Sequence, residues 1–136
     1  ARHVQRPVPE KEKSYPENRM FGDSLPAYGL YVRHVRGLTL DNVHFTLRHA
    51  DARSAMVFED AHAIDLRQLQ ADPATPAAPL VQFKACSQIA VSGFRTRQPL
   101  EQFAGLEACA PDALRLFGND FSQVKRVSNL PDPAGR

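Results

Sequence analysis

The sequence has few cysteines, no long apolar run and no cluster of charge of one sign. Its two cysteines, Cys86 and Cys109, form no metal-binding motif, and because their sequence contexts differ we expect free thiols rather than a disulfide. No stretch approaches the length of a membrane span, which excludes a transmembrane helix. Basic and acidic residues are mixed along the chain and give a net charge of +2, so nucleic acid is not an expected partner.

Motifs for hydrolytic, metal or phosphate chemistry are also missing. The glycines form no phosphate-binding loop, and no serine lies in an elbow motif such as GxSxG; the serines considered are Ser14, Ser24, Ser54 and Ser87. The histidines lie at positions that predict solvent exposure, a corner or a tail, and none has the spacing to a carboxylate or cysteine that zinc requires. We therefore predict no catalytic residue, no metal and no cofactor.

One apolar pattern recurs along the chain with nearly constant spacing. It covers residues 30–47, 56–69 and 81–94 and, less cleanly, residues 116–127. A repeat of about 25 residues with short strands in each copy is typical of a stacked solenoid. Within each copy, apolar positions alternate with polar ones, as expected for strands with one buried face.

Equivalent positions in the copies hold similar residues. Val32, Phe58 and Phe83 share one apolar column, and Asn42 and Gly93 share a later polar column with Gln68. Asn and Gly tolerate left-handed backbone angles, so the polar column suits a tight corner. Three short strands per copy, without paired helices or leucine-rich motifs, predict an all-β, right-handed parallel β-helix of about three to four coils.

We expect residues 1–136 to form a single incomplete β-helix domain with one short helix. Leu100, Phe103 and Leu106 are spaced by three, and Pro99 lies near a first turn, which predicts the helix. Prolines interrupt the first segment, so we expect a long N-terminal loop that folds back on the solenoid. The predicted segments are a loop (1–29), three coils (30–96), a helical insertion (97–112), a last coil (113–130) and a polar tail (131–136).

The first half of the chain also resembles a known family. The runs that are similar are Tyr15-Pro16-Glu17, Met20-Phe21-Gly22, Leu25 to Val35, Gly37 to Leu40, Asn42-Val43 and Asp51-Ala52-Arg53. They resemble the C-terminal section of bacterial polygalacturonase-like enzymes, glycoside hydrolase family 28. The resemblance covers residues 8–70 and implies the pectin-lyase-like right-handed β-helix. It also implies a secreted or periplasmic parent enzyme that acts on pectic or related acidic polysaccharide.

The catalytic residues that this resemblance implies are absent from the chain. The family uses aspartates on adjacent coils, a histidine and an Arg-x-Lys motif, and none of its motifs occurs here. The nearest sequence, Glu59-Asp60, places neighbouring strand residues on opposite faces, so the two cannot act together as acid and base on one glycosidic oxygen. We interpret Glu59-Asp60 as structural and Gly118-Asn119-Asp120 as a turn.

A separate hypothesis concerns substrate binding. Tyr15, Glu17, Arg19 and Tyr28 lie on the N-terminal loop, where an arginine could hold a sugar carboxylate and a tyrosine could stack on a pyranose ring. Arg53, at the corner after the first coil, could present its guanidinium in the same way. In the structural alternative, Tyr28 packs on the first coil, Glu17 pairs with Arg19, and Arg53 pairs with its neighbour Asp51 to hold a turn.

The sequence therefore predicts the C-terminal part of a polygalacturonase-like glycosidase, which caps the solenoid, could form a wall of the sugar cleft and is not catalytic alone. It opens Ala1-Arg2-His3, with no initiator Met or secretory signal, so we expect a processed or truncated piece. The expected partners are acidic polysaccharide and the missing N-terminal coils; an open coil edge predicts self-association or marginal stability unless the loop covers it. Two alternatives stay open, a non-catalytic carbohydrate-binding or assembly module and a polysaccharide lyase fragment.

Overall fold

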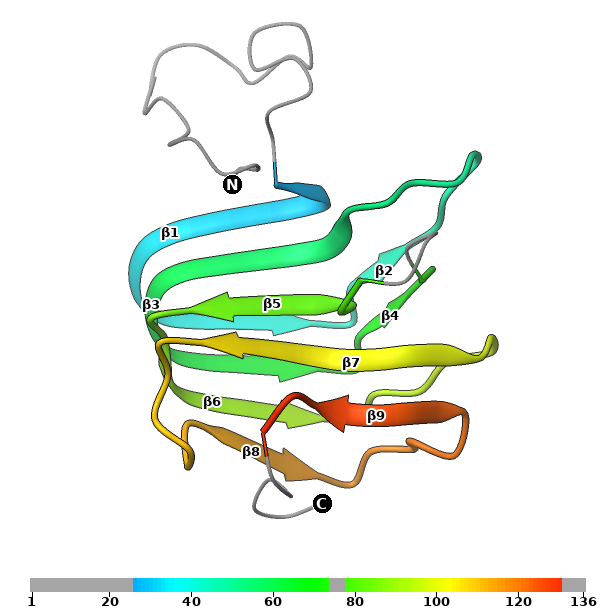
Figure 1. The fold of residues 1–136 in the computed structure, drawn as a ribbon. Coiled ribbons are helices and arrows are strands. Elements are labelled where there is room, and N and C mark those ends of the chain that lie inside the picture. Colours follow the sequence, from blue (N-terminus) through cyan, green and yellow to red (C-terminus); the bar gives the residue numbers. More distant parts are fainter. Residues whose placement is uncertain (1–25, 74–77, 131–136) are drawn as a thin grey trace, which may run out of the picture.

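The computed structural model describes residues 26–73 and 78–130, which are all-β. Their strands wind into a right-handed parallel β-helix of about 4 turns, which confirms the predicted fold (Figure 1). Tyr15, Glu17 and Arg19 lie outside the described residues, as does most of the predicted N-terminal loop. Within the described ranges, no helix has the length and apolar character that crossing a membrane requires.

Each turn of the solenoid is built from strands that pair in parallel with their equivalents one turn away (Figure 1). The first two turns each contain one long bent strand that contributes to two faces, whereas later turns use two separate strands. A short strand pair forms a small third face. The elements are β1 (Ala27–Asp41), β2 (His44–Phe45), β3 (Ser54–Arg67), β4 (Gln70–Ala71), β5 (Val81–Lys84), β6 (Ser87–Ser92), β7 (Leu100–Glu107), β8 (Leu114–Phe117) and β9 (Val124–Ser128).

The strand register confirms the apolar columns expected from the repeat. Val32 pairs with Phe58, Phe58 with Phe83, and Phe83 with Leu106 in successive turns. The rings of Phe58 and Phe83 stack with centroids 5.4 Å apart, and both side chains are fully buried. Because residues of one column lie on top of one another, the core is a set of apolar piles that runs along the solenoid.

The corners of the solenoid are formed by residues with left-handed backbone angles. Every described residue with φ near +60° to +80° falls in one of three columns that repeat with the turns. The predicted corner column is confirmed, and two further columns flank the bend between the first two faces. The three columns are His34, Asp60, Ala85 and Ala108; Gly37, Ala63 and Gln88; and Asn42, Gln68, Gly93 and Gly118.

Alanine at a left-handed corner carries steric strain that glycine avoids. Ala63 has a φ of 60°, where a Cβ costs about 1–2 kcal/mol. We expect Ala63→Gly to raise the free energy of unfolding by about 0.5–1 kcal/mol, after the greater freedom of glycine in the unfolded chain is subtracted. Urea denaturation measures the change. Ala90→Gly, in strand β6, is the matched control and should lower stability; equal losses in both variants would contradict the left-handed corner.

The predicted helical insertion at residues 97–112 is wrong, because this segment holds strand β7. β7 pairs in parallel with β5, Val81 with Ala104 and Phe83 with Leu106, and so supplies the first strand of the fourth turn. Gly105 permits this approach, since a Cβ there would meet the Gln82 side chain and lie 2.9 Å from Pro79 Cγ. Strand β9, within the predicted last coil, pairs with β7 and begins the next turn.

This register also changes the interpretation of Cys109. Both cysteines are free, as expected, but Cys109 follows β7 at the position equivalent to Cys86 one turn earlier. The backbone N–H of Cys86 donates to Cys109 Sγ at 3.4 Å. Burial raises the pKa of the Cys86 thiol to about 11, so this thiol is protonated and unreactive at neutral pH. The two thiols therefore share one core column rather than lying in different contexts.

Candidate functional site

Tyr28, predicted as a substrate contact, is held between two turns at the start of β1. Its hydroxyl donates to the carbonyl oxygen of Asp72 at 2.6 Å, and its ring meets Phe45 edge-on with centroids 6.3 Å apart. Burial, followed by the charge of Asp72, raises its pKa to about 12. These contacts are the ones that the structural alternative for Tyr28 expects.

The raised pKa of Tyr28 makes stability depend on alkaline pH. Below pH 10 the Tyr28 phenol is protonated in both the folded and the unfolded chain, so its full contribution to the free energy of unfolding is present. Between the ordinary pKa of 10.0 and the folded value of about 12, the unfolded chain loses its proton first and stability falls. We expect Tyr28→Phe to flatten this decline and to cost about 1 kcal/mol at pH 7 through the lost hydrogen bond. Urea denaturation at several pH values measures both; an unchanged alkaline slope would contradict the assignment.

Arg53, the other described residue of the substrate hypothesis, makes a two-pronged contact with Asp51. Its Nε lies 2.9 Å from Asp51 Oδ1 and its Nη2 lies 2.8 Å from Oδ2, while the Arg53 N–H also donates to Oδ1. These hydrogen bonds hold the pKa of Asp51 below its usual range. The local pair of the structural alternative is therefore present. Ala27 pairs with Ser54, so the structure brings Tyr28 and Arg53, which follow and precede them, into one region.

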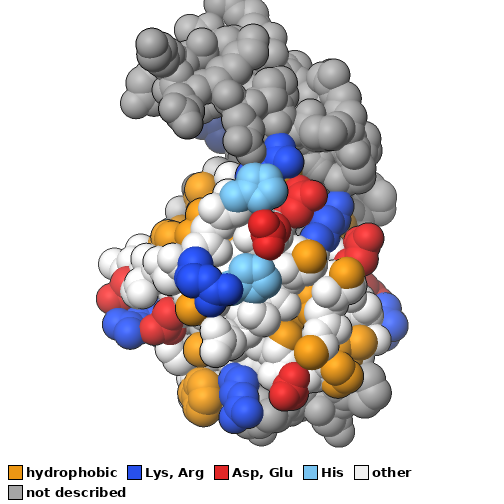
Figure 2. Space-filling view, turned by 90° about the vertical axis from the view of Figure 1, so that its left-hand side faces the viewer, with side chains coloured by type: hydrophobic (Ala, Val, Ile, Leu, Met, Phe, Trp, Pro, Cys, Tyr) orange, Lys and Arg blue, Asp and Glu red, His pale blue; other side chains and the backbone are white. Residues whose placement is uncertain are grey.

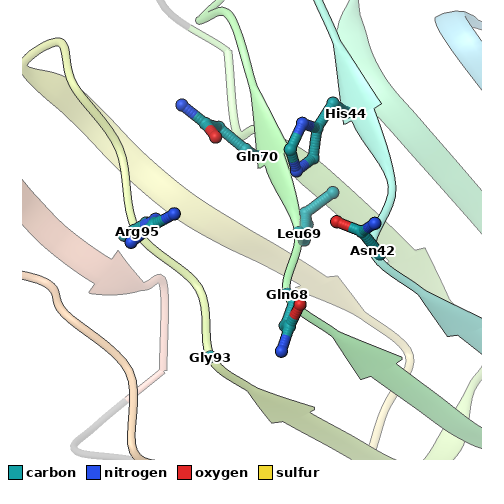
Figure 3. Close-up of a pocket in the computed structure, with 7 residues that line it drawn as sticks. All are labelled: Asn42, His44, Gln68, Leu69, Gln70, Gly93 and Arg95. Atoms are coloured by element: carbon teal, nitrogen blue, oxygen red, sulfur yellow. The ribbon is translucent and has the colours of Figure 1, made fainter.

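A polar hollow of about 250 Å³ lies beside the predicted corner column (Figure 3). Side chains from neighbouring turns surround it, and strands β2 and β4 position two of them, since His44 pairs with Gln70. The residues around it are Asn42, His44, Gln68, Leu69, Gln70, Gly93 and Arg95. The hollow thus combines carboxamides, an imidazole and a guanidinium.

The backbone and the side chains around this hollow have different roles. The N–H groups of Asn42 and Gln68 donate to the carbonyl oxygens of Arg67 and Ser92, both at 2.8 Å, and continue the ladders around the corner. In residues 26–73 and 78–130, the carboxamides of Asn42 and Gln68 and the guanidinium of Arg95 make no hydrogen bond with other side chains. Their donors and acceptors are therefore available to a ligand.

A second polar group crosses three turns at the bend between the first two faces. His34 Nδ1 lies 2.9 Å from Asp60 Oδ2, and His62 Nε2 lies 3.0 Å from Asp60 Oδ1. His62 Nδ1 in turn lies 2.7 Å from Ser87 Oγ. Histidine side chains accordingly lie beside acidic and basic ones on the bent side of the solenoid (Figure 2).

The charge of Asp60 determines the direction of these hydrogen bonds. The bonds from His34 and His62 hold the pKa of Asp60 below its usual range, so this side chain is a carboxylate that only accepts. Because Asp60 only accepts, His62 donates from Nε2, and in the neutral imidazole Nδ1 then presents its lone pair to the Ser87 hydroxyl. In that neutral form, the order of donation is from Ser87 to His62 and from His62 to Asp60.

Ser87 also borders a groove of about 460 Å³ that is lined by residues of β6, of the segment before β8 and of β8 itself. The groove is mostly apolar and contains one residue of each charge, Asp112 and Arg115. Phe117 at its rim is the exposed large hydrophobic residue of the described part, with 54% of its surface accessible. The other lining residues are Gln88, Ile89, Ala90, Ala110 and Ala113.

Sequence reasoning missed the bond between His62 and Ser87 and the role of Asp60. It assumed strand alternation at these positions, but Asp60 and Ala63 both have left-handed angles, so alternation fails between them. The repeat itself holds the missing signal, because His62 pairs with Ser87 in the register of the turns. Among the described residues, no group of three or more His, Cys, Asp or Glu is arranged to hold a metal ion.

Comparisons with family models, curated proteins and solved structures gave no match for this chain.

Proposed function

We propose that the chain is the C-terminal portion of a polygalacturonase-like β-helix and holds one acidic sugar unit of a pectic polysaccharide beside Arg95. The supporting observation is the hollow, where an arginine, a histidine and carboxamides from neighbouring turns face a common space. The β-solenoid is the architecture that the sequence resemblance implies. In this role the chain extends the solenoid and forms one wall of the sugar cleft.

The chemistry of the hollow suits a uronate. A guanidinium binds a carboxylate through paired charge-assisted hydrogen bonds, and carboxamides both donate to and accept from sugar hydroxyls. The hollow has a volume of about 250 Å³. Sites that enclose drug-sized ligands are larger, with volumes of about 300–1,000 Å³. The hollow therefore suits one sugar ring rather than an enclosed oligosaccharide.

The described carboxylates support the view that glycosidic hydrolysis needs other parts of the protein. Glu59 accepts a hydrogen bond from the Tyr31 hydroxyl at 2.5 Å, and Asp60 accepts from two histidines. Inverting hydrolysis requires two carboxyl groups that flank a sugar and a water. Glu59 and Asp60 are occupied by these partners and are not such a pair.

Titration calorimetry with trigalacturonate tests the proposed binding. We expect the chain to bind it, and Arg95→Ala to weaken the affinity about tenfold or more, as loss of a charged hydrogen bond does. Arg97→Ala is the matched control, because Arg97 is exposed on the same segment but does not border the hollow. The methyl-esterified trimer should bind more weakly than the acid. Equal loss in both variants, or no binding of the acid, would contradict the proposal.

The coding region upstream of Ala1 tests the other half of the proposal. A polygalacturonase-like parent predicts further coils in frame, with the family's aspartate and histidine motifs. Retained sugar binding without such coils would instead support a carbohydrate-binding or assembly module. For the lyase alternative, clustered carboxylates for calcium would be needed, and the described part of the chain contains no such group.

A further inference from the structure

We propose that Ser87 and His62, positioned by Asp60, form a site that hydrolyses esters of short apolar acids, with the adjoining groove as the acyl site. This activity goes beyond sugar binding at Arg95 and does not depend on it. Two independent observations meet at Ser87. One is the hydrogen-bonded series from Ser87 through His62 to Asp60, and the other is the groove that Ser87 borders.

The distances fit a serine activated by a neighbouring base. Ser87 Oγ to His62 Nδ1 is 2.7 Å, and His62 Nε2 to Asp60 Oδ1 is 3.0 Å, both within the about 2.6–3.2 Å at which a nucleophile and its base interact. Asp60 selects, for the neutral imidazole, the tautomer whose Nδ1 accepts the serine proton. The two imidazole nitrogens exchange the roles they have in serine proteases, but the order of nucleophile, base and orienting carboxylate is the same.

The solenoid fixes these groups on rigid backbone. Ser87 begins β6, and parallel pairing places it directly beside His62 of β3. Asp60 and Ala63, on either side of His62, both have left-handed backbone angles. Nδ1 of His34, from the first turn, lies 2.9 Å from Asp60 Oδ2, the oxygen that does not contact His62. The geometry is therefore held before any substrate arrives, which is what a catalytic group requires.

The groove determines the class of substrate. Ala90 and Ala110 give the groove apolar surface near Ser87, and Phe117, which pairs with Ser92 at the other end of β6, extends it, which suits a short alkyl chain on the acyl side. Gln88 and Arg115 supply N–H donors in the same groove for the oxygen that becomes negative during attack. Asp112 also borders the groove, and its negative charge disfavours an anionic acyl group.

The reaction proceeds in two balanced steps. Ser87 Oγ attacks the ester carbonyl and its proton passes to His62 Nδ1; the bond to the alcohol then breaks, and the alcohol leaves with that proton. Water attacks the acylated serine, its proton passes to His62 Nδ1, the bond to Ser87 Oγ breaks, and the serine recovers the proton. The products are one carboxylic acid and one alcohol, with a single water consumed. Asp60 stays ionised and stabilises the imidazolium in both steps.

Labelling with a fluorophosphonate probe and hydrolysis of p-nitrophenyl butyrate test this site in the full chain. The probe should attach to Ser87, as located by peptide mass spectrometry, and Ser87→Ala should abolish both labelling and catalysed hydrolysis. His62→Ala should lower the rate about 10²-fold, the typical contribution of a general base. Asp60→Asn should lower kcat with KM unchanged, because Asp60 acts through His62.

Matched controls exclude nonspecific effects. Ser92→Ala lies on the same strand and His49→Ala on an exposed loop, and both should leave rate and labelling unchanged. Thermal denaturation shows whether each variant is folded. We expect Ser87→Ala to fold, because serine and alanine side chains are similar in size. Labelling elsewhere than Ser87, or equal hydrolysis by wild type and Ser87→Ala, would overturn the proposal. Neither result would affect binding of trigalacturonate at Arg95.

Discussion

Phe83→Ala is expected to lower the free energy of unfolding by about 3–5 kcal/mol. Phe83 is fully buried in the third turn, where its ring stacks on Phe58 at 5.4 Å with only 13° between the planes. The next turn covers its other side, since Phe83 pairs with Leu106. Truncation would leave a cavity between turns that parallel ladders hold at fixed spacing, so the neighbouring side chains cannot close it.

Chemical denaturation followed by far-UV circular dichroism measures this loss. Phe117→Ala is the matched control, because the same side chain is removed from a position that is 54% exposed. We expect its cost to be below about 1 kcal/mol, since surface substitutions rarely change stability much. Equal costs at the two positions would show that the apolar piles do not hold the turns together.

Asn119→Ala is expected to cost about 2–4 kcal/mol, the second largest effect. Its side-chain Oδ1 accepts from the Phe94 N–H at 2.8 Å, and its Nδ2 donates to the Val91 carbonyl at 2.9 Å. Val91 and Phe94 are buried residues of the third turn, so alanine would leave one donor and one acceptor without a partner. The side-chain amide of Asn119 thus takes the place of backbone hydrogen bonds between turns at this corner, where Gly118 has a φ of 62°.

A short variant series at position 119 separates the two hydrogen bonds. Asn119→Asp keeps the acceptor for Phe94 but loses the donor for Val91, so we expect about half of the alanine cost. Urea denaturation of the three proteins should give free energies of unfolding that decrease from the wild type to the aspartate variant to the alanine variant. Wild-type stability in the alanine variant would contradict the bridging role.

The repeat in the sequence was sufficient to predict the solenoid because equivalent residues contact one another. Val32, Phe58 and Phe83 share a column in both sequence and structure, and Asn42 and Gln68 lie at real corners. Local spacing was the weaker guide. The spacing of Leu100, Phe103 and Leu106 fits a helix. The pairing of β7 with β5 makes this segment a strand instead, and a local pattern cannot show such a long-range contact.

The sites were predicted less well than the fold, for a physical reason. A sequence shows which residues share a column, but not whether their side chains leave a space between them. Arg95 was therefore not anticipated beside the corner column, although Asn42 and Gln68 were placed there. His62 was predicted to be exposed and Asp60 to be structural; in the structure the side chain of His62 is 26% accessible and that of Asp60 is 53% accessible. The proposed chemistry arises from the hydrogen bonds that join Asp60, His62 and Ser87.

The most direct test of the account is a two-dimensional amide NMR titration of the chain with trigalacturonate. We expect the largest shift changes at Asn42, Gln68, Gln70 and Arg95, and their loss in Arg95→Ala. Shift changes that cluster on another face, or no change at millimolar ligand, would contradict the claim that this solenoid binds an acidic sugar at its corner hollow.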